Sequence, residues 1–140
     1  KYDDAADVWS VTSYRELYRD GQAAERWNWL HPGEKPREAF VTTCLKGTEG
    51  VIVAASDYVK ILPGAIDRWA PRRVTALGTD GFGRSEGRAS LRDFFEVDAK
   101  HIVLATLDDL AREGKIDVKV AQQAVKDLGI NPEKPNPAIS

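Results

Sequence analysis

Hydrophobic positions along the chain form two kinds of pattern, short runs typical of strands and longer stripes typical of helices. In residues 7–12, Val8, Ser10 and Thr12 alternate with Trp9 and Val11, and β-branched side chains dominate. Residues 51–55 form a continuous apolar run between Gly50 and Ser56. The alternating run predicts a strand, and the continuous run predicts a strand covered on both faces, as in a parallel sheet. Residues 74–77 predict a third strand.

Helical segments in the first half of the chain are short or interrupted. Ser13 and Glu16 have the spacing of a capping box, which predicts a helix from there to about Tyr18. Gly21 is expected to break or bend that helix, and residues 25–30 form another helical turn. Further helical segments are predicted at residues 38–45 and at residues 57–69, the second weakened by an internal proline and glycine.

Capping residues predict three helices in the second half of the chain. Ser85 can cap a helix that runs to about Phe95, and Asp98 and Asp117 can cap the next two. Each of the last two helices carries an apolar stripe on one face and is followed by a glycine, which is typical of a helix C-terminus. These two helices are predicted at residues 99–113 and 118–128.

The predicted strands and helices alternate along most of the chain, which indicates an α/β fold. We expect a three-layer, mostly parallel sheet with helices on both faces, formed by a single domain over residues 1–130. Residues 131–140 hold three prolines and are expected to be a C-terminal tail.

The composition excludes several classes of function but does not identify the function. The 140 residues include 20 Lys and Arg against 22 Asp and Glu, a net charge of −2, which argues against binding nucleic acid or an anionic membrane by bulk charge. One cysteine excludes an internal disulfide, and with only two histidines it excludes a four-ligand Cys/His zinc site. No apolar run approaches the length of a membrane span. Methionine is absent, so we expect the chain to be a piece of a longer protein.

A glycine-rich stretch between the third predicted strand and the following helix is the most informative local motif. Ligands of open α/β sheets bind at such strand ends, where glycines allow close approach and an arginine can grip a carboxylate or phosphate. The alternative is a tight turn whose arginine contacts a neighbouring domain, because the glycine spacing matches neither the dinucleotide motif nor the P-loop. The stretch consists of Gly78, Thr79, Asp80, Gly81, Phe82, Gly83, Arg84 and Ser85.

A second candidate is the segment that concentrates Arg26, Trp27, Trp29 and His31. Exposed tryptophan and arginine together are typical of a contact surface. The alternative is that one tryptophan belongs to the core, because residues two apart on a helix point in different directions. His31 precedes a proline on a predicted loop and has no neighbouring partner for catalysis or metal binding.

Three stretches, taken together and in this order, closely resemble the C-terminal domain of the homodimeric, bacterial-type pyruvate dehydrogenase component. They read VWSVTSYRELYRDGQ at residues 8–22, ERWNWLHPGEKPR at residues 25–37, and ALGTDGFGRSEGRASLRDFFEVDAKHIVLATLDDLAREG at residues 76–114. The sequence GTDGFGRS with the acidic and aromatic helix after it is the most specific part. A weaker similarity extends to transketolases.

The resemblance implies a function for the parent enzyme and a non-catalytic role for this chain. The full enzyme decarboxylates pyruvate on thiamine diphosphate and passes the acetyl unit to lipoyl groups of the dihydrolipoyl acetyltransferase core. Thiamine diphosphate and Mg²⁺ would be bound by two preceding domains, so no catalytic, cofactor-binding or metal-binding residue is expected here. The chain would be a structural, transketolase-C-terminal-like domain that supports a homodimer in the bacterial cytoplasm.

The sequence departs from the family at its start. The family's domain begins with a further strand, a glycine turn and a helix, and these are absent before Asp7. We therefore expect a domain that lacks its first strand and helix. Two alternatives stay open: a module that binds an anion or regulatory ligand through Gly78–Ser85, and a module that docks the acetyltransferase core through Trp27 and Trp29.

Overall fold

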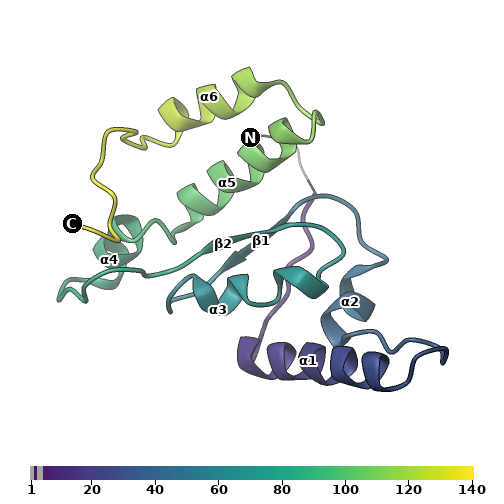
Figure 1. Ribbon diagram of the computed structural model, residues 1–140. Helices are drawn as coiled ribbons and strands as arrows, with labels where there is room; N and C mark the ends of the chain where they lie inside the picture. Colours follow the sequence, from purple (N-terminus) through teal and green to yellow (C-terminus); the bar gives the residue numbers. More distant parts are fainter. Residues whose placement is uncertain (1, 3–4) are drawn as a thin grey trace.

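Two parallel strands lie at the centre of the computed structural model, which describes residue 2 and residues 5–140 (Figure 1). β1 (Ile52–Ala55) pairs with β2 (Val74–Leu77) along the whole length of both strands. The crossover between them contains α3 (Ile61–Gly64) and the short 3₁₀ helix η1 (Asp67–Trp69). Because the strands are parallel, their carboxyl ends meet at one edge of the sheet, and so do the loops that follow them.

Helices lie on both sides of this sheet and confirm the α/β arrangement expected from the sequence (Figure 1). On one side α5 (Ala99–Arg112) contacts both strands, and α6 (Val118–Asp127) packs on α5. On the other side α3 contacts the strands, with α1 (Tyr14–Leu30) and α2 (Phe40–Leu45) beyond it. α4 (Arg88–Phe94) lies at the carboxyl edge.

The apolar core is divided between the two sides of the sheet. One cluster contains Ala39, Val41, Ile66 and Trp69, with the inner face of α1 packed against it. The other cluster joins α5 to α6 through Leu107, Ala121 and Ala124. Among the described residues no helix is both long enough and apolar enough to cross a membrane.

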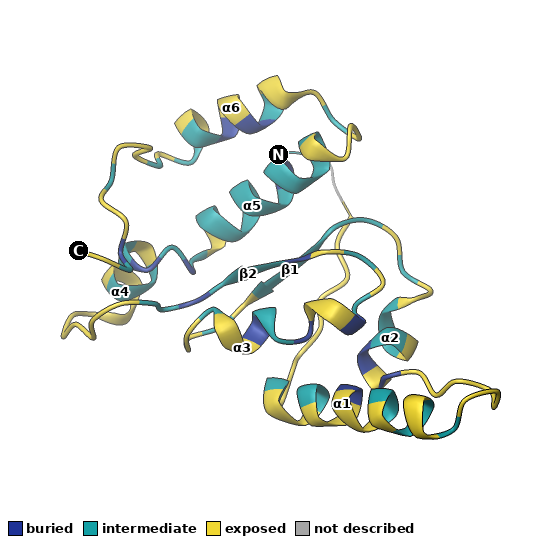
Figure 2. Cartoon of the chain, viewed as in Figure 1, coloured by how far each residue is buried: buried dark blue, intermediate teal, exposed yellow. Residues whose placement is uncertain are grey.

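The strand side chains are mostly half-buried, whereas the continuous apolar run predicted burial on both faces (Figure 2). Val74 is buried and Ala55 is exposed, and the other residues of the two strands are half-buried. The reason is the width of the sheet: within the described residues each strand has one neighbour, so solvent reaches both outer edges.

The predicted strand at residues 7–12 is wrong. This segment is exposed, with Val8 95% and Trp9 54% accessible, and it forms no strand. Its β-branched side chains favour an extended backbone, but a strand also needs a hydrogen-bonded neighbour. No described segment provides that neighbour.

α1 differs from its prediction because it runs without a break through Gly21. Ser13 caps the helix as expected, and its Oγ accepts a hydrogen bond of 3.2 Å from the backbone N–H of Glu16. A methyl group at Gly21 would lie 2.5–2.6 Å from ring carbons of Trp69, so the glycine makes room for the indole. A long-range contact therefore explains a residue that local propensity interprets as a helix breaker.

Two other predicted helices begin or end elsewhere. The helical pattern at residues 57–69 divides into α3 and η1, because Pro63 shortens the helix. The prediction that Ser85 caps a helix is wrong: α4 begins at Arg88 and its N-cap is Gly87.

The last two helices follow their local signals closely. The Asp98 carboxylate accepts a hydrogen bond of 3.1 Å from the His101 N–H, and the Asp117 carboxylate accepts one of 2.9 Å from the Lys119 N–H. A glycine with positive φ, of 70° and 64° respectively, follows each helix at Gly114 and Gly129.

Residues 131–140 fold back along α4 (Figure 1). The Lys134 ammonium donates hydrogen bonds to the carbonyl oxygens of Asp93, at 2.6 Å, and Phe94, at 2.8 Å. It thereby binds carbonyl groups at the C-terminal end of α4, where a cation is favoured by the helix dipole. Pro137 is buried, and its carbonyl oxygen lies against Gly81 of the loop after β2.

Candidate functional site

The loops that follow β1 and β2 are hydrogen-bonded to each other at the carboxyl edge of the sheet. The N–H of Thr79 donates to the carbonyl of Tyr58 at 2.8 Å, and its hydroxyl donates to the carbonyl of Asp57 at 2.9 Å. The carboxylate of Asp80 accepts from the N–H of Lys60 at 2.8 Å. Because open α/β sheets bind ligands at this edge, we take these loops and their surroundings as the candidate site.

The glycines of the predicted loop allow backbone segments to approach one another. A Cβ atom at Gly78 would lie 2.5 Å from the carbonyl oxygen of Tyr58 and 2.7 Å from the nitrogen of Lys60. Gly81 has a φ of +100°, and its Cα faces the carbonyl oxygen of Pro137. The tight-turn interpretation of the stretch rests on such close backbone approaches and stays a prediction. Anion binding by the same loop stays a prediction.

The remaining residues of the loop point outward or stack on α4. Phe82 is 81% exposed, and Gly83 and Ser85 are exposed as well. The guanidinium carbon of Arg84 lies 4.2 Å from the centre of the Phe94 ring, a cation–π contact that fixes its direction.

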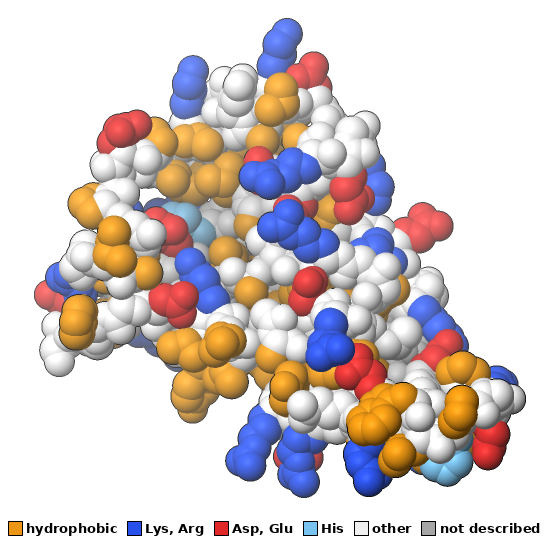
Figure 3. Space-filling view, in the orientation of Figure 1, with side chains coloured by type: hydrophobic (Ala, Val, Ile, Leu, Met, Phe, Trp, Pro, Cys, Tyr) orange, Lys and Arg blue, Asp and Glu red, His pale blue; other side chains and the backbone are white. Residues whose placement is uncertain are grey.

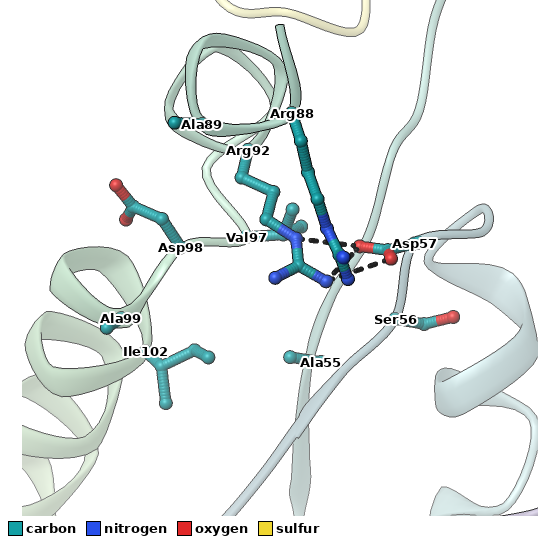
Figure 4. A pocket seen from close by; sticks show the side chains of 10 residues that line it. All are labelled: Ala55, Ser56, Asp57, Arg88, Ala89, Arg92, Val97, Asp98, Ala99 and Ile102. Atoms are coloured by element: carbon teal, nitrogen blue, oxygen red, sulfur yellow. Dashed lines mark hydrogen bonds and ion pairs between the residues drawn. The ribbon is translucent and has the colours of Figure 1, made fainter.

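A hollow of about 760 Å³ lies between this edge, α4 and the start of α5 (Figure 4). Arg88 and Arg92, one turn apart on α4, both extend toward Asp57 in the loop after β1. Arg92 binds the Asp57 carboxylate through two nitrogens, with its shortest contact 3.0 Å. A smaller hollow of about 420 Å³ shares these three residues and continues toward Arg84.

Sequence reasoning missed Asp57, Arg88 and Arg92. A signal was present, because an acidic residue directly after a buried strand and two arginines four positions apart after a glycine-rich loop would meet at one sheet edge. The arrangement places two guanidinium groups beside one carboxylate. The apolar walls of the larger hollow include Ala55, Ala89, Val97, Ala99 and Ile102.

A cluster of charged side chains adjoins the hollow at the N-terminus of α5. The Nδ1 of His101 lies 2.7 Å from an Asp98 carboxylate oxygen, and the ammonium of Lys100 lies 2.7 Å from Asp93 and 3.6 Å from Asp98. The potential metal ligands Asp93, Asp98 and His101 are within 4.8 Å of one another. The Lys100 ammonium, however, already supplies the positive charge between the two carboxylates.

These contacts lower the pKa of both carboxyl groups. Partial burial of Asp98 acts to raise its pKa, but hydrogen bonds from the His101 side chain and backbone, with the charges of His101 and Lys100, outweigh that effect and lower it. The hydrogen bond from Lys100 is the main cause of the lowered pKa of Asp93. The same pairing raises the pKa of Lys100.

Asp98 is expected to make the stability of the fold fall in acid. Its pKa is lower in the folded state than in the unfolded chain, so the carboxylate stabilises the fold above about pH 4, and this contribution is lost as the pH falls through the folded pKa. Asp98→Asn keeps an acceptor for the helix cap but removes the titration. Chemical denaturation between about pH 5 and about pH 2 should show a smaller acid loss for the variant than for the parent chain.

Asp117 provides the matched control for this measurement. It caps α6 through the N–H of Lys119, so Asp117→Asn makes the same substitution at the cap of a different helix. Equal acid losses in the parent chain and in Asp98→Asn would contradict the prediction.

The tryptophan-rich segment forms the C-terminal end of α1 and places its two indoles in different environments. Trp27 stacks on His31 with ring centres 4.3 Å apart, and the guanidinium carbon of Arg37 lies 4.1 Å from the Trp27 ring centre. Trp29 is 69% exposed, and Arg26 is exposed as well. The structure therefore brings His31 to Trp27 and leaves Arg26 and Trp29 on the surface. His31 serves as the C-cap of the helix.

The sequence of this chain is similar to a known domain family and to several bacterial proteins. The family model described as the transketolase-like C-terminal domain matches residues 1–98. The chain is 53% identical over 133 residues to the pyruvate dehydrogenase E1 component of Pseudomonas aeruginosa, which covers 94% of this chain and 15% of that protein. It is 44% identical over 140 residues to the E1 component of Escherichia coli K12, covering 99% of this chain and 16% of the relative. The chain thus spans about 15% of the length of these relatives.

Proposed function

The chain belongs to the transketolase-like C-terminal domain family, and from that membership we propose that it is the non-catalytic C-terminal domain of a pyruvate dehydrogenase E1 component. The observation that carries the proposal is the 53% identity to such a component across 94% of this chain, which is only 15% of the relative. Because 140 residues is the size of one typical domain, we interpret the chain as one domain of such an enzyme.

The activity we propose for the parent protein is the oxidative decarboxylation of pyruvate with thiamine diphosphate and Mg²⁺. The acetyl unit would pass to lipoyl groups of a dihydrolipoyl acetyltransferase core. We propose that the parent is a homodimer in the bacterial cytoplasm. Support comes from the name shared by the bacterial relatives, pyruvate dehydrogenase E1 component, and from their similarity along this chain.

The carboxylates of Asp80, Asp93 and Asp98 do not fit a magnesium site that would hold thiamine diphosphate. Magnesium takes six oxygen ligands, usually from carboxylates, water and phosphate. Here Asp80 is bound to a backbone N–H, and Asp93 and Asp98 are bound to Lys100 and His101. We therefore assign the cofactor and its metal to other parts of the parent enzyme.

Support for a structural role comes from the surface of the carboxyl edge. Tyr58 is 71% exposed, Ile61 75%, Phe82 81% and Ile139 84%. The contacts that Thr79, Asp80 and Gly81 make with backbone atoms of neighbouring segments hold the loops that carry these side chains, so the apolar groups stand on a fixed framework. Large apolar groups gathered on a surface are typical of a contact with another domain or subunit. Figure 3 shows apolar side chains on this side of the molecule, around α3 and the neighbouring loops.

A domain exchange tests the proposal. We would replace the matching segment of the Pseudomonas aeruginosa enzyme with this chain, and compare it with the same enzyme lacking the segment. The exchanged enzyme should remain dimeric and acetylate lipoyl domains from pyruvate, and the deletion should lose both properties. An exchanged enzyme that folds and dimerises but has no activity would contradict a purely structural role.

Calorimetry on the 140-residue chain tests its non-catalytic assignment separately. Titration with thiamine diphosphate and Mg²⁺ should give no binding heat in the micromolar range. Micromolar binding that Arg84→Ala abolishes would overturn the assignment and make the loop a cofactor site. Arg112→Ala, at an exposed position on α5, is the matched control.

An anion-binding role is the second candidate, and the paired arginines of the hollow favour it. Arg88 and Arg92 offer planar donors that suit carboxylate or phosphate, beside the predicted loop of Gly78 to Ser85. Titration with inorganic phosphate, followed by NMR shifts of the arginine side chains and the loop amides, separates this role from the structural one.

A further inference from the structure

The outer face of α1 carries a stripe of basic residues. At 100° per residue, Arg15, Arg19 and Arg26 project within about 40° of one another, and Trp29 lies about 40° to the other side of Arg15. All four are exposed. We call this set the basic face of α1. The opposite side of the helix packs Leu17 and its neighbours against the core. Figure 3 shows Lys and Arg side chains projecting from the part of the surface formed by α1.

The acidic side chains of α1 lie outside the middle of this face, and each is paired with another group. Asp20 accepts a hydrogen bond of 2.6 Å from the N–H of Phe40 at the start of α2. Glu25 pairs with Arg68 of η1 at 2.9 Å, and Glu16 pairs with Arg19 at 3.1 Å. Within the described part of the chain, Arg15 and Arg26 form no ion pair, so the basic face has an uncompensated positive charge.

An apolar anchor stands at one end of the basic face. Trp29 is 69% exposed, and the neighbouring Leu30 is 46% exposed. The helix is fixed at this end, because the Asn28 side chain makes two hydrogen bonds, of 2.9 and 2.7 Å, with the backbone of Arg37. An exposed tryptophan next to arginines on a rigid element has the chemistry of an interface hot spot.

We propose that the basic face of α1 docks an acidic protein segment, which lays an apolar side chain against Trp29. Its carboxylates would pair with Arg15, Arg19 and Arg26, whose spacings of four and seven residues match one face of a partner helix. This inference goes beyond the structural role proposed above, since it assigns a specific partner chemistry to the surface opposite the core. A protein segment is favoured over nucleic acid because the chain's net charge is −2 and the basic face of α1 offers one exposed indole, Trp29, for stacking.

The test uses the 140-residue chain and a synthetic helical peptide. The peptide carries glutamates along one face and a leucine near each end, with a fluorescent label read by anisotropy. One matched peptide has glutamine in place of glutamate, and another has alanine in place of leucine. A single-stranded oligonucleotide of equal charge is the competitor that represents the other class of partner.

We expect the acidic peptide to bind in the micromolar range, and more weakly as salt rises. Arg15→Glu with Arg26→Glu should weaken binding by about tenfold or more, because both reverse a charge on the docking face. Lys119→Glu with Lys126→Glu, on the exposed side of α6, changes the net charge equally and should weaken it by no more than about twofold. Trp29→Ala should weaken the leucine peptide about fivefold and leave the alanine peptide nearly unchanged.

Several results would overturn the proposal: no binding of the acidic peptide at about 1 mM, equal binding of the glutamine peptide, or an equal loss in the α6 control. Tighter binding of the oligonucleotide than of the peptide would assign the face to nucleic acid instead. Circular dichroism checks that each variant keeps its helix content. Arg15→Gln with Arg26→Gln gives a second variant, which removes both charges without reversing them.

Discussion

Gly21→Ala is expected to lower the free energy of unfolding by about 3 kcal/mol. Helix propensity alone predicts the opposite, because alanine is favoured over glycine inside a helix by about 1 kcal/mol. The added methyl group would lie 2.5–2.6 Å from carbons of the Trp69 indole, which is 8% exposed and held in the core. Either the ring or α1 must move. Urea denaturation followed by far-UV circular dichroism measures the change.

Two comparisons isolate this steric effect. Gly47→Ala introduces a methyl group with no atom within 4 Å, so it should leave stability nearly unchanged. In a Trp69→Leu background the space beside Gly21 is larger, and Gly21→Ala should then cost much less than it does beside the indole. A stabilised Gly21→Ala chain with the native tryptophan would refute the packing argument.

Gly78→Ala has the second large expected effect, a loss of about 3 kcal/mol of unfolding free energy. Here the obstructing atoms belong to the backbone: the Tyr58 carbonyl oxygen would be 2.5 Å from the new Cβ and the Lys60 nitrogen 2.7 Å. No side-chain rotation relieves such a contact. The two loops must separate, and the hydrogen bond from Thr79 to Tyr58 must lengthen or break.

Hydrogen exchange locates the effect of Gly78→Ala. The amides of Thr79 and Lys60 should exchange faster in the variant, whereas amides in the middle of α6 should follow only the global change in stability. Gly83→Ala, in the same loop but with no atom within 4 Å of the added carbon, is the matched control. Unchanged protection at Thr79 would show that the loops accommodate the methyl group.

Features that depend on neighbouring residues could be predicted from the sequence. Asp98 and Asp117 cap α5 and α6, and Gly114 and Gly129 follow these helices with positive φ, because capping involves only contacts within a few residues. The strands β1 and β2 were also predicted, since their runs are short, apolar and bounded.

Features that depend on residues far apart in the sequence could not be predicted. Gly21 lies inside α1 because Trp69, far along the chain, needs the space. Residues 7–12 have the pattern of a strand, but a pattern cannot supply the neighbouring strand on which pairing depends.

The candidate site shows the same division. The sequence indicated the position of the glycine-rich loop at a strand end, because that position follows from the order of elements. It did not indicate that the Asp80 carboxylate would bind the N–H of Lys60, or that Arg92 would reach Asp57. Both contacts join segments that are far apart in the sequence. The sequence alone allows many other pairings of the charged residues.

The four tryptophans occupy four different environments, and this makes the chain its own optical reporter. Trp69 is 8% exposed, Trp27 is half-buried against His31, and Trp9 and Trp29 are 54% and 69% exposed. An indole shielded from water emits at shorter wavelength than a hydrated one. The emission spectrum is therefore a composite whose short-wavelength part reports the docking of α1 on the core. Its long-wavelength part, which a soluble quencher such as acrylamide reaches first, reports the outer surface.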